Sequence, residues 1–160
     1  MDFRGKVGLI TGAASGIGRA TALGFAQRGG SVVVADIHEA NATAVAKEIT
    51  DTGGNAIPVV ADVTNKTDLD AMLAHTVESF GRLDFLHNNA FGLGNPGGTN
   101  NLAARTADLD DGIWDNMVDL GLSSVFRSMK KAIPIMRQTG GGAIVNTASI
   151  SGLRADYGIA

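Results

Sequence analysis

The chain has 160 residues, 44% of them hydrophobic and 18% charged, with a formal net charge of -3, which suits one globular domain of modest size. Its 13 Lys and Arg and 16 Asp and Glu form no run of either sign, which argues against nucleic acid or an acidic membrane surface as a partner. The absence of cysteine excludes a disulfide framework, a thiolate zinc site and a cysteine nucleophile, and because it fits a reducing compartment we expect a cytoplasmic protein. The first apolar run breaks at Gly12, too early for a signal peptide or a membrane span.

Short apolar runs alternate with helical faces over the first part of the chain. We expect strands at 7–11, 31–35 and 56–60, because short apolar runs bounded by turn residues are typical of strands that are covered on both faces. Between them, small and apolar residues recur with a period near 3.6 at 17–25 and 42–49, which predicts two helices. The order is therefore strand, helix, strand, helix, strand.

The clearest helical pattern follows the third strand. Its apolar stripe consists of Leu69, Met72, Leu73, Thr76, Val77 and Phe80. Asn65 or Thr67 can cap the start of this helix, and Gly81 follows its end. A fourth strand is expected at 83–87.

Residues 91–108 are expected to form a loop. A loop of this length inside a compact domain is usually functional. Phe91, Leu93 and Leu102, together with the glycine-rich stretch 94–98, suggest a partly apolar lid over a substrate.

One long or broken helix is expected over 111–137, with a kink near Pro134. Its apolar face contains Trp114, Met117, Val118, Leu122 and Val125, followed by Phe126, Met129, Ile133 and Met136. A fifth strand follows at 143–147. Strands that alternate with helices predict an α/β fold with a parallel sheet and right-handed crossovers, and such sheets bind ligands at the carboxyl ends of their strands.

The turn after the first strand is rich in glycine, with TGAASGIG at 11–18. Gly12 permits a tight turn, Gly16 lets the backbone approach a diphosphate, and Gly18 lets the helix pack closely on the strand. Three residues separate Gly12 from Gly16, whereas G-x-G-x-x-G has one residue between its first two glycines. The alternative interpretation is therefore an ordinary strand-to-helix turn without a ligand. The strand before it and the helix after it favour dinucleotide binding.

Asp36 ends the second strand, 18 residues after Gly18. A carboxylate there can accept both hydroxyls of an adenosine ribose. It would repel a 2′-phosphate by roughly 4 kcal/mol per charge pair at about 4 Å, or about a thousandfold in affinity, which favours NAD over NADP. Arg19 is the one cation close enough in sequence to offset this repulsion.

Five motifs follow one another along the chain: TGAASGIG at 11–18, Asp36, ADV at 61–63, NNA at 88–90 and IVNTAS at 144–149. Together they resemble the short-chain dehydrogenase/reductase family over the entire chain. The resemblance implies a Rossmann-type doubly wound parallel sheet with strand order 3-2-1-4-5, to which the family adds further strands. It also implies that 1–160 is a single dinucleotide-binding domain.

The resemblance implies a set of site residues. Asp62 and Val63 would contact the adenine, Asn89 and Ala90 would line the cofactor, and Ser149 would hydrogen-bond the substrate oxygen as the catalytic residue. The backbone of Thr147 would lie near the nicotinamide. The complete expected cofactor-binding set is Gly12, Ser15, Gly16, Ile17, Gly18, Asp36, Ile37, Asp62, Val63, Asn89, Ala90 and Thr147.

Two residues depart from the family pattern inside the chain. Phe91 follows Ala90 where the family continues with glycine, so an aromatic ring either enters the substrate cleft or packs under the loop. Gly121 stands where the family carries an asparagine that helps organise its proton relay. Without that asparagine, position 121 has no side chain to hold a water of the relay.

A third departure concerns the proton donor. The family places a tyrosine about thirteen residues after the serine and a lysine one helical turn later, which from Ser149 means positions 162 and 166, beyond Ala160. Tyr157 comes too early and is expected to be a loop residue. We therefore expect the chain to be the N-terminal portion of a longer enzyme, incomplete at its C-terminus and lacking the C-terminal strands.

These observations predict an NAD-dependent oxidoreductase that interconverts a secondary alcohol and a ketone, a small-molecule substrate, by hydride transfer. The alternative is a catalytically silent nucleotide-binding or assembly protein of the same fold, and a weaker reading is a structural fragment that binds nothing. His38, His75 and His87 show no metal-ligand spacing, so no metal is expected. The resemblance implies a homo-oligomer when full length, associated through the helix at 111–137.

Overall fold

The computed structural model of the chain describes residues 1–92, 107 and 109–153. Its centre is a five-stranded sheet in the order β3-β2-β1-β4-β5, with every neighbouring pair parallel, which confirms the predicted order. The strands are β1 (Val7–Thr11), β2 (Ser31–Asp36), β3 (Asn55–Val60), β4 (Phe85–Asn88) and β5 (Ala143–Asn146). Tyr157, Leu93, Leu102 and the stretch 94–98 lie outside the described residues.

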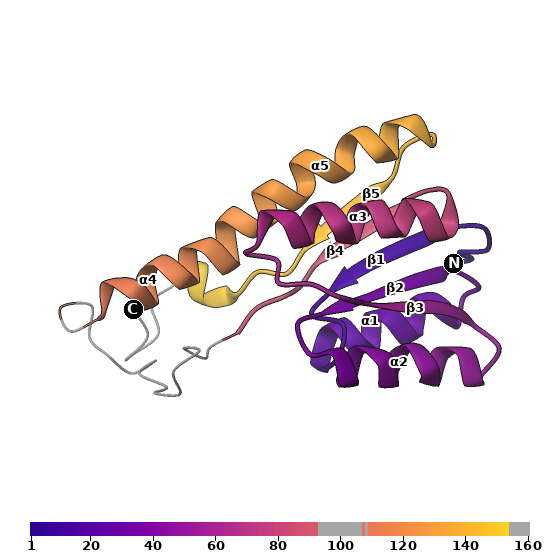
Figure 1. Cartoon of the computed structure of the whole chain (residues 1–160), viewed down its shortest axis with the longest axis horizontal. Coiled ribbons are helices and arrows are strands. Elements are labelled where there is room, and N and C mark those ends of the chain that lie inside the picture. Colours follow the sequence, from indigo (N-terminus) through magenta and orange to yellow (C-terminus); the bar gives the residue numbers. More distant parts are fainter. Residues whose placement is uncertain (93–106, 108, 154–160) are drawn as a thin grey trace.

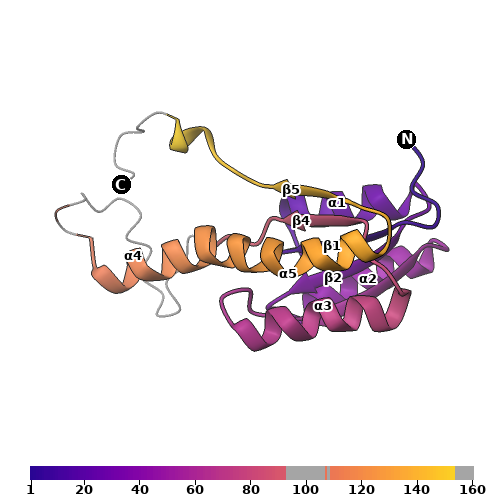
Figure 2. The same cartoon turned by 90° about the horizontal axis from the view of Figure 1, so that it is seen from above.

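Helices cover both faces of this sheet (Figure 1). The first face carries α1 (Gly16–Ala26) and α2 (Glu39–Asp51), and the opposite face carries α3 (Lys66–Phe80) and α5 (Ser124–Gln138). α4 (Asp111–Val118) precedes α5 and projects beyond the end of the sheet. Figure 2 shows α3 and α5 side by side in front of the strands, with α1 and α2 behind them. The connections change face after β3, which makes the sheet doubly wound.

The two layers enclose two apolar cores, one on each side of β1 and β2. Leu9 and Val33 point into the core under α3 and α5, whereas Ile10, Val32 and Val34 point into the core under α1 and α2. All five are fully buried. Burial of such a side chain stabilises the fold by about 1.5–3 kcal/mol, so the central strands are the best-anchored part of the sheet.

The start and end of α3 follow the predicted capping. Asn65 Oδ1 accepts hydrogen bonds from the backbone N–H groups of Thr67 and Asp68, at 2.8 and 3.4 Å. Gly81 ends the helix in the left-handed conformation, with φ of 75°. Of the two residues proposed as caps, Asn65 is thus the one that caps.

Of the two expected forms of the C-terminal helix, long or broken, the structure shows the long one, because residues 111–138 are helical without a gap. The π-helical segment Asp119–Ser123 separates α4 from α5, and α5 continues through Pro134 to Gln138. The apolar face predicted for this helix is only partly buried: Trp114, Leu122 and Phe126 are exposed, whereas Met136 is buried. The buried positions of α5 are Ser124, Ser128, Ala132 and Met136.

Small side chains explain this orientation of α5. Ser128 Oγ donates a 2.6 Å hydrogen bond to Asn88 Oδ1 on β4, which a helix could not make through a layer of larger side chains. Ser128 and Ala132 are fully or almost fully buried. Within the described part of the chain, no helix has the length and apolar character needed to cross a membrane.

Candidate functional site

The carboxyl ends of β1, β2 and β4 meet at one edge of the sheet, where most of the predicted site residues lie. The loop after β1 leads into α1, and the backbone N–H of Ala13 donates to the carbonyl of Ala35 at the end of β2, over 3.0 Å. This edge is the place where an open parallel sheet binds ligands.

Three glycines shape the loop after β1. Gly12 has φ of 61°, and a Cβ atom there would lie 2.9 Å from Ala90 Cα. A Cβ atom on Gly18 would collide with the carbonyl oxygen of Gly12 and lie 2.6 Å from Asn89 Nδ2. Gly16 also has positive φ, of 51°, but its surroundings among the described residues are open. Gly12 and Gly18 therefore permit close packing, whereas Gly16 borders free space.

The N-terminus of α1 faces that space. Ser15 is the N-cap residue in an extended conformation, and within the described residues its hydroxyl caps no helix N–H group. The first helix N–H groups, at Gly16, Ile17 and Gly18, have no partner inside a helix and carry its partial positive charge. Because an anion supplies the missing acceptors, this terminus fits a diphosphate group. The Ile17 side chain is exposed beside it.

Asp36 is held beside the same loop. Its Oδ2 accepts a hydrogen bond from the Ala14 backbone N–H at 3.0 Å, and its Oδ1 accepts one from the His38 backbone N–H at 3.0 Å. The His38 imidazole Nδ1 lies 3.2 Å from Oδ1, and the carboxyl side chain is only 10% exposed. Ile37, the next residue, is exposed. Each carboxylate oxygen has two lone pairs, so Oδ2, which accepts one hydrogen bond, retains capacity for a ligand hydroxyl, whereas Oδ1 already faces two nitrogens of His38.

The residues that follow β4 form hydrogen bonds with the loop after β1. Thr11 Oγ1 accepts hydrogen bonds from the backbone N–H groups of both Asn89 and Ala90, each at 3.0 Å. Asn89 Nδ2 donates to the carbonyls of Thr11 and Gly12, at 3.1 and 3.3 Å. Thr11 was missed as a functional residue in the sequence, because its role depends on a neighbour 78 positions away.

Asp62 and Val63 follow β3 at the far side of Asp36. The backbone N–H of Ala61 donates to the Asp36 carbonyl over 3.0 Å, which joins this segment to the end of β2. Asp62 Oδ1 accepts hydrogen bonds from the backbone N–H and the hydroxyl of Thr64, at 2.9 and 2.7 Å. Val63 is buried in the core under α3. Asp62 therefore shapes its own turn.

Thr147 and Ser149 lie beyond the end of β5. Thr147 N–H donates to the Asn88 carbonyl at 3.0 Å, and its hydroxyl lies 3.2 Å from Asn89 Oδ1 and 2.9 Å from His87 Nε2. Ser149 is exposed, and its carbonyl accepts a hydrogen bond from Gly152 N–H at 3.1 Å in a short 3-10 turn. Thr147 is thus joined to the glycine loop through Asn89, and Ser149 is two residues further on.

The two residues that depart from the family pattern face each other. A Cβ atom on Gly121 would lie 3.8 Å from Phe91 Cε2, which is ordinary contact distance. Gly121 lies in the π-helical segment between α4 and α5, and such segments often occur at functional sites. Phe91 is 57% exposed. An aromatic ring therefore lies where a longer side chain at position 121 would project.

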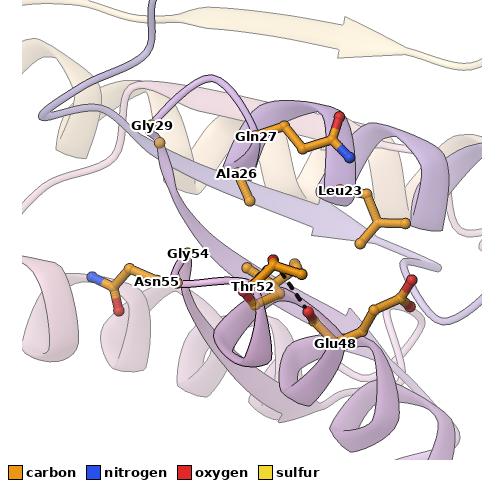
Figure 3. Close-up of a pocket in the computed structure, with 11 residues that line it drawn as sticks. Leu23, Ala26, Gln27, Gly29, Glu48, Thr52, Gly54 and Asn55 are labelled. Atoms are coloured by element: carbon orange, nitrogen blue, oxygen red, sulfur yellow. Dashed lines mark hydrogen bonds between the residues drawn. The ribbon is translucent and has the colours of Figure 1, made fainter.

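A separate cavity of about 560 Å³ opens at the opposite edge of the sheet, between the C-terminal ends of α1 and α2 (Figure 3). Its lining includes Leu23, Gln27, Glu48 and Thr52. Thr52 Oγ1 donates to the Glu48 carbonyl at 3.4 Å. None of the predicted site residues lines this cavity.

Comparisons with known proteins agree with the geometry. The family model described as short chain dehydrogenase matches residues 6–160. Cyclohexanol dehydrogenase of Acinetobacter sp. (strain SE19) is 44% identical over 94% of this chain and 57% of that protein. The 3beta-hydroxysteroid dehydrogenase 2 of Eggerthella lenta is 36% identical over 96% of this chain and 57% of that protein.

A solved structure of similar fold is a 7 alpha-hydroxysteroid dehydrogenase complexed with NADH and 7-oxo glycochenodeoxycholic acid. It superposes with a TM-score of 0.88 at 31% identity, over 98% of this chain and 58% of that one. The chain thus spans a little over half the length of these relatives. Because the family model covers nearly all of its residues, the chain belongs to the short-chain dehydrogenase family.

Proposed function

We propose that the complete protein is an NAD(H)-dependent oxidoreductase that interconverts a secondary alcohol and a ketone. The observation that carries the proposal is the pairing of an open helix N-terminus at Gly16–Gly18 with Asp36, which the Ala14 N–H holds beside the same loop. Membership of a family whose relatives are named as alcohol and hydroxysteroid dehydrogenases supports the reaction class.

The residues at this edge fit the dinucleotide. The N–H groups at the start of α1 would bind the diphosphate, with Ser15 and Ile17 beside them. Asp36 would accept the hydroxyls of the adenosine ribose, with Ile37 next to the adenine, and Asp62 and Val63 would border the adenine further along this edge. A 2′-phosphate in place of the ribose hydroxyl would meet the Asp36 carboxylate, so NADP(H) would bind more weakly.

The other half of the crevice would hold the reacting groups. Asn89, Ala90 and Thr147 would border the nicotinamide, since hydrogen bonds join all three to the loop after β1, directly or through one another. The bound cofactor supplies the hydride chemistry. Ser149 would donate a hydrogen bond to the substrate oxygen and so polarise the bond at the reacting carbon.

The second candidate is a nucleotide-binding protein without turnover. The observation that favours it is Gly121, which has no side chain and whose neighbour among the described residues is the apolar ring of Phe91. Under this alternative the crevice binds NADH but transfers no hydride.

We further propose that the complete protein is a homo-oligomer. Trp114 on α4, Leu122 in the π-helical segment and Phe126 on α5 are exposed, and burial of this apolar surface against a second copy would stabilise a homo-oligomer. Light scattering on the complete protein tests this point, because Phe126→Ser should shift the mass toward the monomer. We also propose a cytoplasmic location, on the basis of a sequence without cysteine.

A titration and a turnover assay on the complete protein test the proposed function. NADH fluorescence should saturate on binding, and NAD with cyclohexanol or a hydroxysteroid should give ketone. Ser149→Ala should keep NADH affinity and lower kcat by about a hundredfold or more. Ser31→Ala, at the opposite edge of the sheet, should leave both unchanged.

The outcomes separate the two candidates. Saturable NADH binding without ketone formation from any alcohol tested would favour the silent nucleotide-binding protein. No binding of NADH at millimolar concentration would reject both.

A further inference from the structure

A chain of side-chain hydrogen bonds crosses the candidate site from β4 to the glycine loop. His87 Nε2 lies 2.9 Å from Thr147 Oγ1, and Thr147 Oγ1 lies 3.2 Å from Asn89 Oδ1. Asn89 Nδ2 in turn contacts the carbonyl oxygens of Thr11 and Gly12, at 3.1 and 3.3 Å. The tips of β4 and β5 and the loop after β1 are therefore joined by three side chains.

The donor and acceptor at each hydrogen bond in this series follow from the hydrogens that each group carries. The Thr11 and Gly12 carbonyls can only accept, so the Asn89 amide must turn its NH₂ group toward them and its Oδ1 toward Thr147. Asn89 Oδ1 also only accepts, and the Thr147 hydroxyl has one hydrogen, which it donates to Asn89. The hydroxyl oxygen is then left to accept from His87, so the proton of the neutral imidazole lies on Nε2.

The surroundings of His87 agree with this tautomer. The residue is 5% exposed, and within the described part of the chain its Nδ1 is buried without a hydrogen-bond partner. Burial lowers the pKa of His87 below its ordinary value, because a second proton would place a charge and an unpaired N–H in the interior. The His87 ring is therefore neutral, with its proton on Nε2 and an unprotonated Nδ1.

We propose that His87 is a positioning residue whose Nε2–H directs the Thr147 hydroxyl to Asn89 and so holds the Asn89 amide on the glycine loop. This inference rests on the proposed function in one respect, that the loop binds NADH. Without the His87 donor, the Thr147 hydroxyl is free to rotate, and Asn89 loses its fixed partner. The loop carbonyls of Thr11 and Gly12 then lose an oriented donor.

Paired substitutions in the complete protein separate this role from simple packing. His87→Gln places an amide N–H near the position of Nε2, whereas His87→Leu fills the space without a donor. Thr147→Ser keeps the hydroxyl, and Thr147→Val removes it at nearly constant shape. Loss of one hydrogen bond should weaken NADH binding about three- to tenfold in the Leu and Val variants, with the Gln and Ser variants within about twofold of wild type.

The double variant tests whether His87 acts on NADH binding through the Thr147 hydroxyl. His87→Leu with Thr147→Val should bind NADH no more weakly than Thr147→Val alone, because Thr147→Val already removes the hydroxyl through which His87 acts. Wild-type affinity in His87→Leu, or equal losses in His87→Leu and His87→Gln, would overturn the proposal. Should His87→Leu fail to fold, His87→Gln decides the question, since a Gln variant that binds NADH as weakly as Thr147→Val would overturn the proposal.

A spectroscopic test needs no cofactor. The ¹⁵N resonances of the His87 ring near neutral pH should show a protonated Nε2 and an unprotonated Nδ1, and Thr147→Val should shift the Nε2 signal. That pattern together with no NADH binding would support the hydrogen-bond chain while rejecting the proposed function. A proton on Nδ1 in a protein that binds NADH would reject the positioning role alone.

Discussion

The backbone N–H of Ala14 donates a 3.0 Å hydrogen bond to Oδ2 of Asp36. The acid at the end of β2 and the loop after β1 thus form one unit before any ligand arrives. A ligand that binds both the helix N-terminus and the carboxylate meets groups whose spacing is already set, so less ordering is required on binding.

Removing the charge of Asp36 should reduce the preference for NADH over NADPH. Asp36→Asn keeps an oxygen that can accept from Ala14 N–H, so the loop should stay in place. NADH should bind less tightly, and NADPH should lose less or gain, because the repulsion of its 2′-phosphate disappears. We expect the affinity ratio to fall about tenfold or more, measured by parallel fluorescence titrations of the two cofactors.

Asp51→Asn is the matched control for this change. Asp51 is an exposed acid that pairs with Lys47 on α2, away from the glycine loop. It should leave both affinities unchanged. Equal losses for NADH and NADPH in Asp36→Asn would contradict the ribose assignment.

A methyl group at Gly18 should disrupt the site and the fold together. The added Cβ would collide with the Gly12 carbonyl, which belongs to the loop backbone and cannot simply rotate away. We expect Gly18→Ala to lower the free energy of unfolding by about 1–3 kcal/mol and to weaken NADH binding, measured by urea denaturation and titration.

Gly24 provides the control within the same helix. Among the described residues, a Cβ atom there would meet only Arg28 Nη1, at 3.5 Å. Gly24→Ala should therefore be neutral or stabilise by up to about 1 kcal/mol, because alanine favours a helix interior. A Gly18→Ala protein as stable as Gly24→Ala would show that the loop can move away from the added methyl group.

Substitutions at Gly121 and Phe91 should be coupled. Gly121→Ala adds a methyl group at contact distance from the Phe91 ring and should be tolerated, whereas the longer side chain of Gly121→Asn would displace the ring. In a double-mutant cycle with Phe91→Ala, measured as kcat/KM for cyclohexanol, we expect an interaction free energy of about 0.5 kcal/mol or more. Strictly additive effects would show that the ring and position 121 are independent during turnover.

The sequence predicted the fold well where the pattern is local. The apolar runs of β1 and β2, the buried stripe of α3 and the Asn65 cap all depend on residues close in the chain, and the structure confirms each of them. The face that α5 buries was not predictable in this way. Its small residues are buried because Ser128 approaches Asn88, a contact set by the sheet rather than by helical periodicity.

The residues of the candidate site show the same contrast between local and long-range patterns. Gly12, Gly18 and Asp36 stand out because their motif spacing is short, and the structure brings them to one edge. Thr11 and His87 do not stand out, because their partners lie 78 and 60 positions away in the chain. A histidine directly after two apolar strand residues was the available signal for His87, but its partner could only be found in three dimensions.

Asp84 should make the stability of the protein depend on acid pH. Arg82 donates to its carboxylate at 2.7 and 2.6 Å, Lys6 donates at 3.0 Å, and the Val7 backbone N–H donates at 3.0 Å. Burial by itself raises the pKa of Asp84, but the hydrogen bonds from Arg82, Val7 and Lys6 outweigh it and hold the pKa below its usual value. The ionised carboxylate therefore ties the start of β1 to the start of β4.

The sign of the effect follows from this lowered pKa. Between the lowered folded value and the ordinary unfolded value, the unfolded chain binds more protons, so stability rises with pH. The contribution of Asp84 is complete above the unfolded pKa, near 3.8, and is lost as pH falls through the folded pKa. Asp84→Asn should be less stable than wild type by about 2 kcal/mol at neutral pH, since a neutral amide with one accepting oxygen replaces the charged carboxylate that accepts from Arg82 and Lys6.

The measurement is urea denaturation of both proteins from neutral pH down to the most acidic pH at which they fold. The difference between wild type and Asp84→Asn should shrink as the pH drops below the unfolded pKa. Asp51→Asn, whose carboxylate pairs with Lys47 at an exposed position, should show little difference at any pH because solvent screens that pair. A gap between wild type and Asp84→Asn that stays constant down to the acid limit would mean that shape alone, and not the charge of Asp84, holds the two strands together.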